Sequence, residues 1–241
     1  MKTYIPNNTV SKDYKGVLNA FVERLVELDK SNIVSIFLTG SFARGEATET
    51  SDLDVWCVFK KINTETLTAV GTISQNLPVS YNDFEVNAQC LSFSEFNSCY
   101  FSNFLAYPII YLEAILLWGN DIATKEIQDG EIEKTYKKFL AEVLLSIRHY
   151  ITVNEPVEKL TFPKIKTWVL KPLMFALRLE RYVYTKHYPV TISELMNAYD
   201  IPLKAVAYFM SKEKWETDIQ SCREATLYSL NNEVEKFLML S

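Results

Sequence analysis

The sequence predicts an α+β protein in which a small mixed sheet with flanking helices is followed by a helical bundle. Two observations support this prediction. Runs of β-branched and alternating apolar residues, typical of strands, occur in the first half of the 241-residue chain. Beyond the Asp129-Gly130 turn, the spacing of apolar residues is helical throughout. We therefore expect two domains, residues 1–122 and residues 123–241.

Most elements of the first domain follow from the spacing of its apolar residues. Residues 12–30 repeat apolar side chains at helical intervals and predict an amphipathic helix. Residues 32–39 and 53–59 are short apolar runs that predict buried strands. Residues 104–118 predict a further helix that ends at Gly119, since glycine commonly stops a helix.

Residues 79–92 predict a third strand with one dry and one wet face. Apolar and polar residues alternate there with the two-residue period of a strand. The apolar series is Phe84, Val86, Ala88 and Cys90, and the polar series is Asp83, Glu85, Asn87 and Gln89. We expect the carboxylates of the polar series to be accessible.

The second domain is predicted to consist of helices. Asn154-Glu155-Pro156 separates the first of them from the second, because proline interrupts a helix. Pro163 suits the first turn of the next helix, where its missing N–H leaves no hydrogen bond unmade. The expected helices cover residues 131–153, 164–186, 191–198, 202–211 and 217–239.

Composition and charge exclude several classes of protein. The net charge of −5 argues against a broad basic face, so no nucleic-acid partner is expected. The most apolar stretch, residues 107–118, is much shorter than the ~20 residues that a membrane helix needs. The four cysteines lack a C-x-x-C spacing, which favours buried, reduced thiols. We therefore expect a soluble protein of the cytoplasm.

Residues 40–55, GSFARGEATETSDLDV, combine residue types that suit a polyphosphate and a divalent metal. Gly40 follows a buried strand, and its lack of a side chain allows close approach of the backbone to a phosphate. Ser41 adds a hydroxyl donor, and N–H groups at a helix start there would favour an anion. Asp52 and Asp54 lie two residues apart on the next strand, so both carboxylates lie on one face. Such oxygen ligands suit Mg²⁺.

A third carboxylate, from the strand of residues 79–92, would complete this site. Glu85 and Asp83 both belong to the wet face of that strand. If the strand lies beside Asp52 and Asp54, one of the two acids joins them to bind a metal or to accept a proton from an attacking hydroxyl. The spacing leaves open which acid does so.

These residues resemble the motif of the DNA polymerase β-like nucleotidyltransferase superfamily. Gly40-Ser41, ten intervening residues and Asp52-Leu53-Asp54 match its motif, within a module of about residues 30–120. Arg44-Gly45 resembles minimal and antibiotic-modifying members. Phe84-Glu85-Val86 resembles the third-acid strand of aminoglycoside adenylyltransferases, especially of the streptomycin/spectinomycin type. The resemblance implies that Asp52, Asp54 and Glu85 are catalytic and bind Mg²⁺, with Asp83 in reserve, and that Gly40, Ser41 and Arg44 bind the nucleotide.

The resemblance also covers part of the second domain. In these adenylyltransferases a helical bundle closes over the nucleotide, and LKPLMFALRLERYVYTKHYPVT resembles the matching helix. Lys164, Lys171 and Arg178 recur every seven residues, which places them on one stripe of the expected helix. Lys171 and Arg178 are therefore expected to bind the donor phosphates, with a solvated basic edge as the alternative. Where streptomycin-type enzymes usually carry a phosphate-binding lysine after a proline, this chain has Pro189-Val190-Thr191.

Together these features predict a metal-dependent enzyme that transfers AMP from ATP, or from another nucleoside triphosphate, to a hydroxyl of a small molecule. An aminoglycoside-type antibiotic is the favoured acceptor, and the acidic net charge suits a cationic or neutral molecule. Glu113, which interrupts the apolar residues 107–118, is a candidate to bind a cationic acceptor. Two alternatives stay open: an antitoxin-like enzyme that AMPylates a protein, and a non-catalytic nucleotide-binding module.

Overall fold

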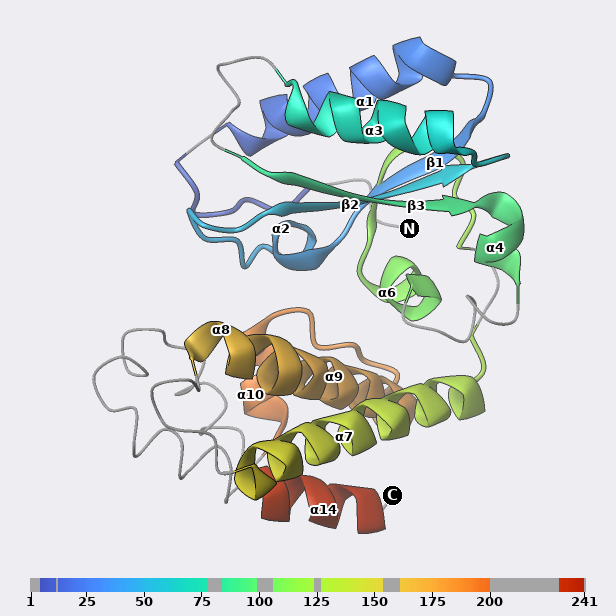
Figure 1. The fold of residues 1–241 in the computed structure, drawn as a ribbon. Helices are drawn as coiled ribbons and strands as arrows, with labels where there is room; N and C mark the ends of the chain where they lie inside the picture. Colours follow the sequence, from blue (N-terminus) through green and yellow to red (C-terminus); the bar gives the residue numbers. More distant parts are fainter. Residues whose placement is uncertain are drawn as a thin grey trace. The chain divides into compact units, whose positions relative to one another are not determined.

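The computed structural model describes residues 5–11, 13–77, 84–98, 106–123, 127–153, 161–199 and 230–240. The chain divides into two compact units, Met1–Ile127 and Gln128–Ser241. The strands lie in the first unit, and the described elements of the second are helices (Figure 1). This α+β arrangement, a mixed sheet with flanking helices followed by further helices, is the one that the sequence predicted.

A mixed sheet forms the centre of the first unit. Among the described residues it has four strands in the order β3-β2-β1-β4. β1 lies antiparallel to β2 and to β4, whereas β2 lies parallel to β3 (Figure 1). The third strand therefore lies beside the second, which is the condition given above for a third carboxylate near Asp52 and Asp54. The strands are β1 (Ile33–Leu38), β2 (Leu53–Phe59), β3 (Val86–Ser92) and β4 (Ile115–Gly119).

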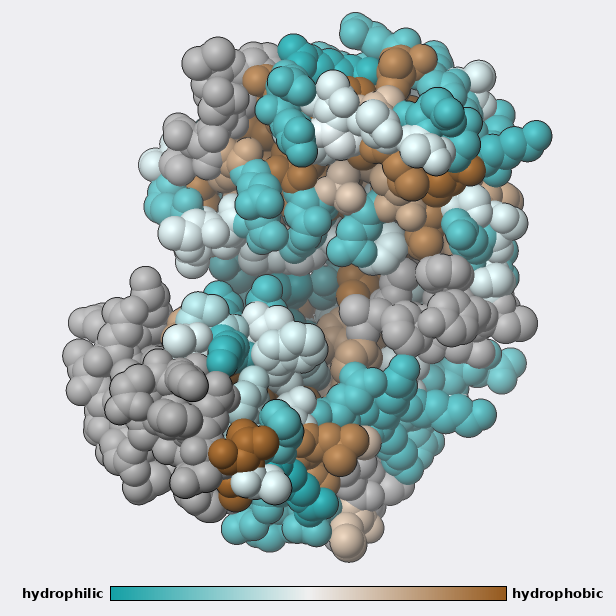
Figure 2. All heavy atoms as spheres, viewed as in Figure 1, coloured by the Kyte–Doolittle hydropathy of each residue, from teal (hydrophilic) through white to brown (hydrophobic). Residues whose placement is uncertain are grey.

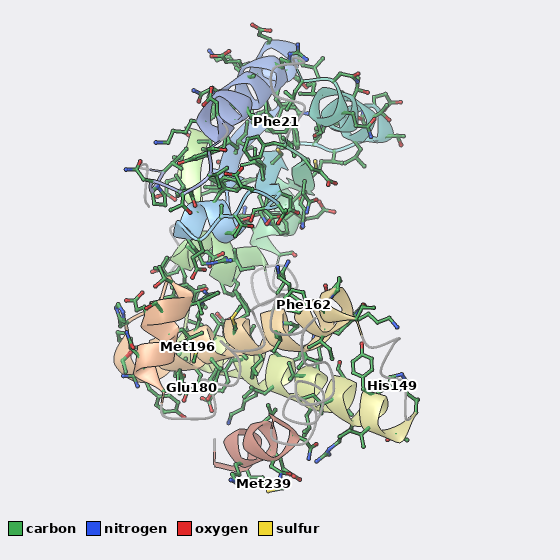
Figure 3. All side chains as sticks on the ribbon, turned by 90° about the vertical axis from the view of Figure 1, so that its left-hand side faces the viewer. Phe21, His149, Phe162, Glu180, Met196 and Met239 are labelled. Carbon is green, nitrogen blue, oxygen red and sulfur yellow. The ribbon has the colours of Figure 1, made fainter. Side chains whose placement is uncertain are left out.

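Helices α1 (Tyr14–Asp29) and α3 (Thr64–Gln75) lie over the same face of this sheet (Figure 1). α1 begins after Asp13, whose carboxylate accepts a hydrogen bond from the N–H of Gly16 at 2.9 Å and so caps the helix. The apolar side of α1, with the fully buried Phe21 (Figure 3), packs into the core formed with β1 and β2. Because side chains alternate along a strand, the polar residues of β2 emerge on the opposite face.

α3 is a helix that the apolar spacing does not reveal. Its only buried residue is Val70, so its apolar stripe is too narrow to stand out in the sequence. The helix start is better marked, because the side chain of Asn63 accepts a hydrogen bond from the N–H of Thr66 at 2.8 Å. α3 supplies the crossover that a parallel connection from β2 to β3 requires.

The predicted helix of residues 104–118 is wrong in its second half. α6 spans Ala106–Leu112, but Ile115–Gly119 forms β4 against β1. A short apolar run suits a buried helix and a strand equally well. The strand prevails because the backbone groups on this edge of β1 need hydrogen-bond partners. Gly119 therefore ends a strand, with a φ of +86° in the left-handed region.

The second unit consists, in its described part, of helices packed along one another. α7 and α9 lie side by side, and α14 packs against α7 (Figure 1). The predicted helix of residues 202–211 and the first part of that of residues 217–239 lie outside the described residues. Within the described residues, no helix has both the length and the apolar character that crossing a membrane requires. The described helices of the second unit are α7 (Asp129–Thr152), α8 (Phe162–Ile165), η3 (Lys166–Leu170), α9 (Lys171–Thr185), α10 (Ile192–Ala198) and α14 (Leu230–Leu240).

The first unit also contains two single-turn helices, α2 (Gly40–Arg44) and α4 (Phe93–Asn97).

The stretch from α8 to α9 is continuous but contains one π turn, η3. Pro172, at the start of α9, has no N–H to donate to the carbonyl four residues earlier. The N–H of Lys171 bonds to the carbonyl of Lys166, five residues earlier, as in a π-helix. This wider turn interrupts the regular α-helical spacing between Lys164 and Lys171.

Gly119→Ala is expected to destabilise the first unit. A Cβ at this position would overlap the backbone carbonyl of Val34, and its φ also disfavours a side chain. The free energy of unfolding, measured by urea denaturation, should fall by roughly 1–3 kcal/mol. The matched control is Gly71→Ala in α3, where a Cβ meets open space and alanine should stabilise by about 0.5–1 kcal/mol. Equal effects of the two substitutions would contradict the tight strand end.

Candidate active site

The turn after β1 brings Gly40 against the carboxylate of Asp54. The N–H of Thr39 donates to the carbonyl of Asp54 at 2.9 Å, which joins the end of β1 to the start of β2. Gly40 has a φ of +72°, and a Cβ there would overlap the Asp54 carboxylate. A side chain is thus excluded on both conformational and steric grounds. Ser41 follows as the second residue of α2.

The pairing of β2 with β3 brings Asp52, Asp54 and Glu85 to one end of the sheet. The N–H of Leu53 donates to the carbonyl of Glu85 at 2.9 Å, and Asp54 lies opposite Asn87 in the register. Since Leu53 is fully buried under the helices, the alternation of the strand turns Asp52 and Asp54 to the other face. Glu85 stands two residues before Asn87 and shares that face. Asp52 and Glu85 are exposed, and Asp54 is half-buried.

Asn87 is a site residue whose contact the sequence does not reveal. Its Nδ2 donates to Oδ1 of Asp54 at 3.0 Å. This hydrogen bond orients the carboxylate and leaves Oδ2 directed toward Gly40. In the sequence, Asn87 belongs to the polar series of the third strand, two residues after Glu85. Its contact with Asp54 depends on which strand lies beside β3, and the sequence does not specify this.

The donor atoms gathered here suit a hard divalent cation. Carboxylate oxygens are the protein ligands that Mg²⁺ prefers. Asp52 and Asp54 belong to one face of the strand, and the carboxylate of Asp54 lies against the bare Cα of Gly40. Among the described residues, no three acidic, cysteine or histidine side chains are gathered closely enough to hold a metal without other ligands. A Mg²⁺ ion here would therefore draw on the aspartates together with substrate oxygens, as this ion commonly does. Asp83, the reserve acid, lies outside the described residues.

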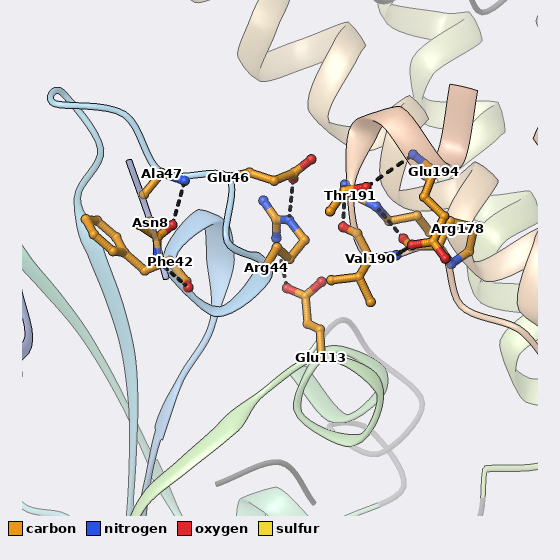
Figure 4. Close-up of polar contacts among 11 residues, drawn as sticks. Asn8, Phe42, Arg44, Glu46, Ala47, Glu113, Arg178, Val190, Thr191 and Glu194 are labelled. Carbon is orange, nitrogen blue, oxygen red and sulfur yellow. Dashed lines mark hydrogen bonds and ion pairs between the residues drawn. The ribbon is translucent and has the colours of Figure 1, made fainter. Parts of the chain in front are cut away.

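Arg44, which is predicted to bind the nucleotide, is engaged with two carboxylates (Figure 4). Its Nε lies 3.0 Å from Oε2 of Glu46, and its Nη1 lies 3.0 Å from Oε1 of Glu113. Glu113 is only 3% exposed, so Arg44 compensates a buried negative charge. Arg44 thereby links α2 to the connection between α6 and β4. Glu113, the candidate for a cationic acceptor, binds a cation of the chain itself.

Asn8 braces the loop that follows α2 (Figure 4). Its Nδ2 donates to the carbonyl of Phe42 at 3.2 Å, and its Oδ1 accepts from the N–H of Ala47 at 3.0 Å. Gly45, between these two contacts, ends α2 with a left-handed φ of +76°. No sequence spacing connects Asn8 with residues so far along the chain, so sequence reasoning missed it.

Arg178 of α9 is buried and bound to backbone carbonyls. It is 3% exposed, and its Nε and Nη2 donate to the carbonyls of Pro189 and Val190, each at 3.1 Å (Figure 4). These bonds fasten the segment in which the sequence departs from the streptomycin-type enzymes. Lys171, by contrast, is exposed at the start of α9. The two cations predicted to bind phosphate thus share a helix but occupy different environments.

Glu194 fastens the same segment from α10. Its Oε2 accepts from the N–H of Val190 at 2.8 Å, and its Oε1 lies 2.6 Å from Nε2 of His187. Partial burial raises the pKa of Glu194, but the hydrogen bonds to its charged form prevail and hold this pKa below its usual value. Thr191 caps α10, because its Oγ1 accepts from the N–H of Glu194 at 3.1 Å.

Comparison with known proteins identifies the family. A family model described as a nucleotidyltransferase domain matches residues 18–169. The chain belongs to this nucleotidyltransferase family. The predicted superfamily and the predicted class of enzyme are thereby confirmed. The matched range contains Gly40, Asp52, Asp54 and Glu85, whereas Lys171 and Arg178 lie beyond it.

A solved structure supports the fold of this nucleotidyltransferase. Spectinomycin adenyltransferase AAD(9) from Enterococcus faecialis, crystallised with ATP and spectinomycin, matches with a TM-score of 0.56. The similarity covers 92% of this chain and 99% of that chain, at 12% sequence identity. A comparison with curated proteins finds no match. The shared architecture therefore extends through both units, although the sequences have diverged widely.

Arg178→Ala is expected to lower the stability of the second unit. The substitution leaves the carbonyls of Pro189 and Val190 without these donors, which should reduce the free energy of unfolding by roughly 2–4 kcal/mol. Lys171→Ala is the matched control on the same helix. Because Lys171 is exposed, its removal should change the unfolding free energy by less than about 0.5 kcal/mol. An unfolding free energy that Arg178→Ala leaves unchanged would contradict this structural role.

Arg44→Ala is expected to destabilise the first unit by roughly 3–5 kcal/mol, because it leaves the buried charge of Glu113 without this partner. Glu46→Ala, which removes the other carboxylate of Arg44, should cost about 1 kcal/mol or less. The double variant Arg44→Met/Glu113→Leu should recover most of the loss, since it buries no charge. Chemical denaturation of the four proteins measures these differences. A double variant that is no more stable than Arg44→Ala would contradict the ion pair.

Proposed function

We propose that this nucleotidyltransferase transfers AMP from ATP to a hydroxyl group of a small molecule in a Mg²⁺-dependent reaction. One observation carries the proposal. The parallel pairing of β2 and β3 brings Asp52, Asp54 and Glu85 to one end of the sheet, where Asp54 lies against the side-chain-free Gly40. Carboxylates beside an accessible glycine-serine turn are suited to a substrate that carries both a polyphosphate and a metal ion.

The donor would lie at the turn of Gly40 and Ser41. Gly40 adopts a positive φ that favours glycine, and its bare Cα permits close approach to a phosphate. The hydroxyl of Ser41 can donate to a phosphate oxygen. Arg44 acts through the fold in this proposal: its ion pairs with Glu46 and Glu113 hold α2, and so hold the turn.

Asp52 and Asp54 are the residues that would hold Mg²⁺, with Glu85 as the neighbouring third acid. Such an ion neutralises the charge that develops on the transferred phosphoryl group. Asn87 keeps the Asp54 carboxylate oriented by its 3.0 Å hydrogen bond. Oδ2 of Asp54, which faces Gly40, is the oxygen directed toward the donor side of the site.

Glu85 would act as the general base. It lies at the open end of β3 and is exposed, so an acceptor can reach it. Its carboxylate would take the proton of the acceptor hydroxyl as the hydroxyl oxygen attacks the α-phosphorus of the donor, and pyrophosphate would leave. A general base must lie near both the metal and the acceptor. The register of β2 with β3 supports this role, because it places Glu85 beside the start of β2, where Asp52 lies.

The acceptor is proposed to be a neutral or cationic small molecule, with aminoglycoside-type antibiotics as the first class to test. The net charge of −5 disfavours polyanionic acceptors. AAD(9), which shares the fold, was crystallised with ATP and spectinomycin. A screen with α-labelled nucleoside triphosphates against aminoglycosides, lincosamides and spectinomycin, followed by chromatography, tests the acceptor and the base preference together. Label that remains with the protein itself would favour a protein acceptor.

Asp54→Asn should weaken the binding of ATP in the presence of Mg²⁺ by at least roughly tenfold, because one carboxylate charge is lost from the metal site. Isothermal titration calorimetry measures this change. Binding of ATP in EDTA should be weak in the unaltered protein and insensitive to the substitution. Equal affinities of the two proteins for Mg²⁺ and ATP would remove Asp54 from the proposed metal site.

Glu85→Gln should lower the turnover number by about 10²–10⁴-fold while the affinity for Mg²⁺ and ATP changes little, since the amide cannot accept the proton at this step. The matched control is Gln89→Ala, an exposed position on the same face of β3. Gln89→Ala should leave turnover unchanged. If Glu85→Gln retains full turnover with an acceptor found in the screen, Glu85 is not the base.

A further inference from the structure

Two cysteines face each other across β2 and β3. Cys57 pairs directly with Cys90 in the parallel register. Both lie on the face covered by α1 and α3, opposite to the face of Asp54. Neighbouring strands are about 4.8 Å apart, and the Cα atoms of disulfide-bonded cysteines lie about 4.4–6.8 Å apart. The backbone therefore already has the separation that a disulfide needs.

The two thiols differ in their access to solvent. Cys57 is fully buried, whereas Cys90 is half-buried and lines a cavity of about 610 Å³ between α3 and β3. Apolar side chains reach the surface in this region of the molecule (Figure 2). Gly71 of α3 also lines this cavity. A Cβ at Gly71 would meet no other atom, so the space beside it is open. A small reagent can thus reach Cys90 but not Cys57.

The thiols also interact with each other. A hydrogen bond with Cys90, together with burial, raises the pKa of Cys57 well above its usual value. The same hydrogen bond lowers the pKa of Cys90, although burial acts in the opposite direction. Thiolate character and access coincide at Cys90, which is the combination that makes a cysteine reactive.

We propose that Cys57 and Cys90 form a reversible disulfide-forming pair, in which Cys90 reacts with a peroxide that enters the cavity between α3 and β3. The Cys90 thiolate attacks one peroxide oxygen, the O–O bond breaks, and hydroxide leaves, so that sulfenic acid forms on Cys90. The sulfur of Cys57 then attacks the sulfur of Cys90. The S–O bond breaks, the Cys57 proton leaves with the hydroxyl as water, and the disulfide forms.

The position of Cys90 favours a disulfide that is easily reduced again. Cys90 is half-buried and lines the cavity, so a small reductant can reach the bond. β3 also ends the strand order of the described sheet, so no further described strand restrains it when the bond closes. An accessible disulfide is the labile kind.

Peptide mapping by mass spectrometry tests the pair in the full-length protein. After treatment of the folded protein with hydrogen peroxide, followed by denaturation and blocking with iodoacetamide, we expect a linked peptide that contains Cys57 and Cys90 and disappears with dithiothreitol. Cys57→Ser should leave the sulfenic acid of Cys90 unresolved, so that dimedone labels Cys90. Cys90→Ser should abolish the linked peptide, and oxidation of Cys57 should become roughly tenfold slower or more.

The variant Cys99→Ser/Cys222→Ser is the matched control, since it removes the other two cysteines of the chain and should still form the linked peptide. Thermal unfolding of each variant checks that it is folded. Alkylation of both Cys57 and Cys90 after peroxide treatment, or dimedone labelling of Cys57 in preference to Cys90, would overturn the proposal. None of these measurements uses a nucleotide, so the outcome is independent of the proposed transfer reaction.

Discussion

The parallel pairing of β2 with β3 is the constraint on which the candidate site depends. It brings Asp52 and Asp54 close to Glu85, which follows them in the chain after the whole of α3. A slip of one residue would turn Glu85 toward the helices and expose Val86, because side chains alternate with a period of two. Burial of Leu53 and Val86 under α1 and α3 fixes the register against such a slip. Core packing on one face therefore positions the acids on the other.

Two arginines show how charged groups with partners inside a protein organise its loops. The guanidinium of Arg44 meets the carboxylate of Glu113, and that of Arg178 meets the carbonyls of Pro189 and Val190. From sequence alone, either arginine suits a phosphate equally well. Burial of Arg178, and of Glu113 beside Arg44, decides between these roles, because a buried charged group must find partners within the fold. Both side chains therefore act first as ties between segments, whereas Lys171 stays exposed on its helix.

The two faces of the β2–β3 pair carry different chemistry. One face presents oxygen ligands beside Gly40, and the other carries the thiols of Cys57 and Cys90 among apolar residues. Hard cations prefer the first set of ligands, and oxidants or soft reagents prefer the second. Since a strand alternates strictly between its faces, a single pairing event orders both sets. A movement of β3 relative to β2 would therefore change the positions of side chains on both faces.

The sequence by itself determined the class of fold, the position of β2, the wet and dry faces of β3 and the glycine and acids that match the family motif. These features are local, because they rest on periodicity and on residue types within a short segment. Only the tertiary structure decided that residues 115–119 form a strand, that Asn87 holds Asp54 and that Arg44 meets Glu113. In each case the deciding partner lies far away in the chain. Hydrogen bonding and the compensation of buried charge choose such partners in space, and sequence periodicity carries no record of them.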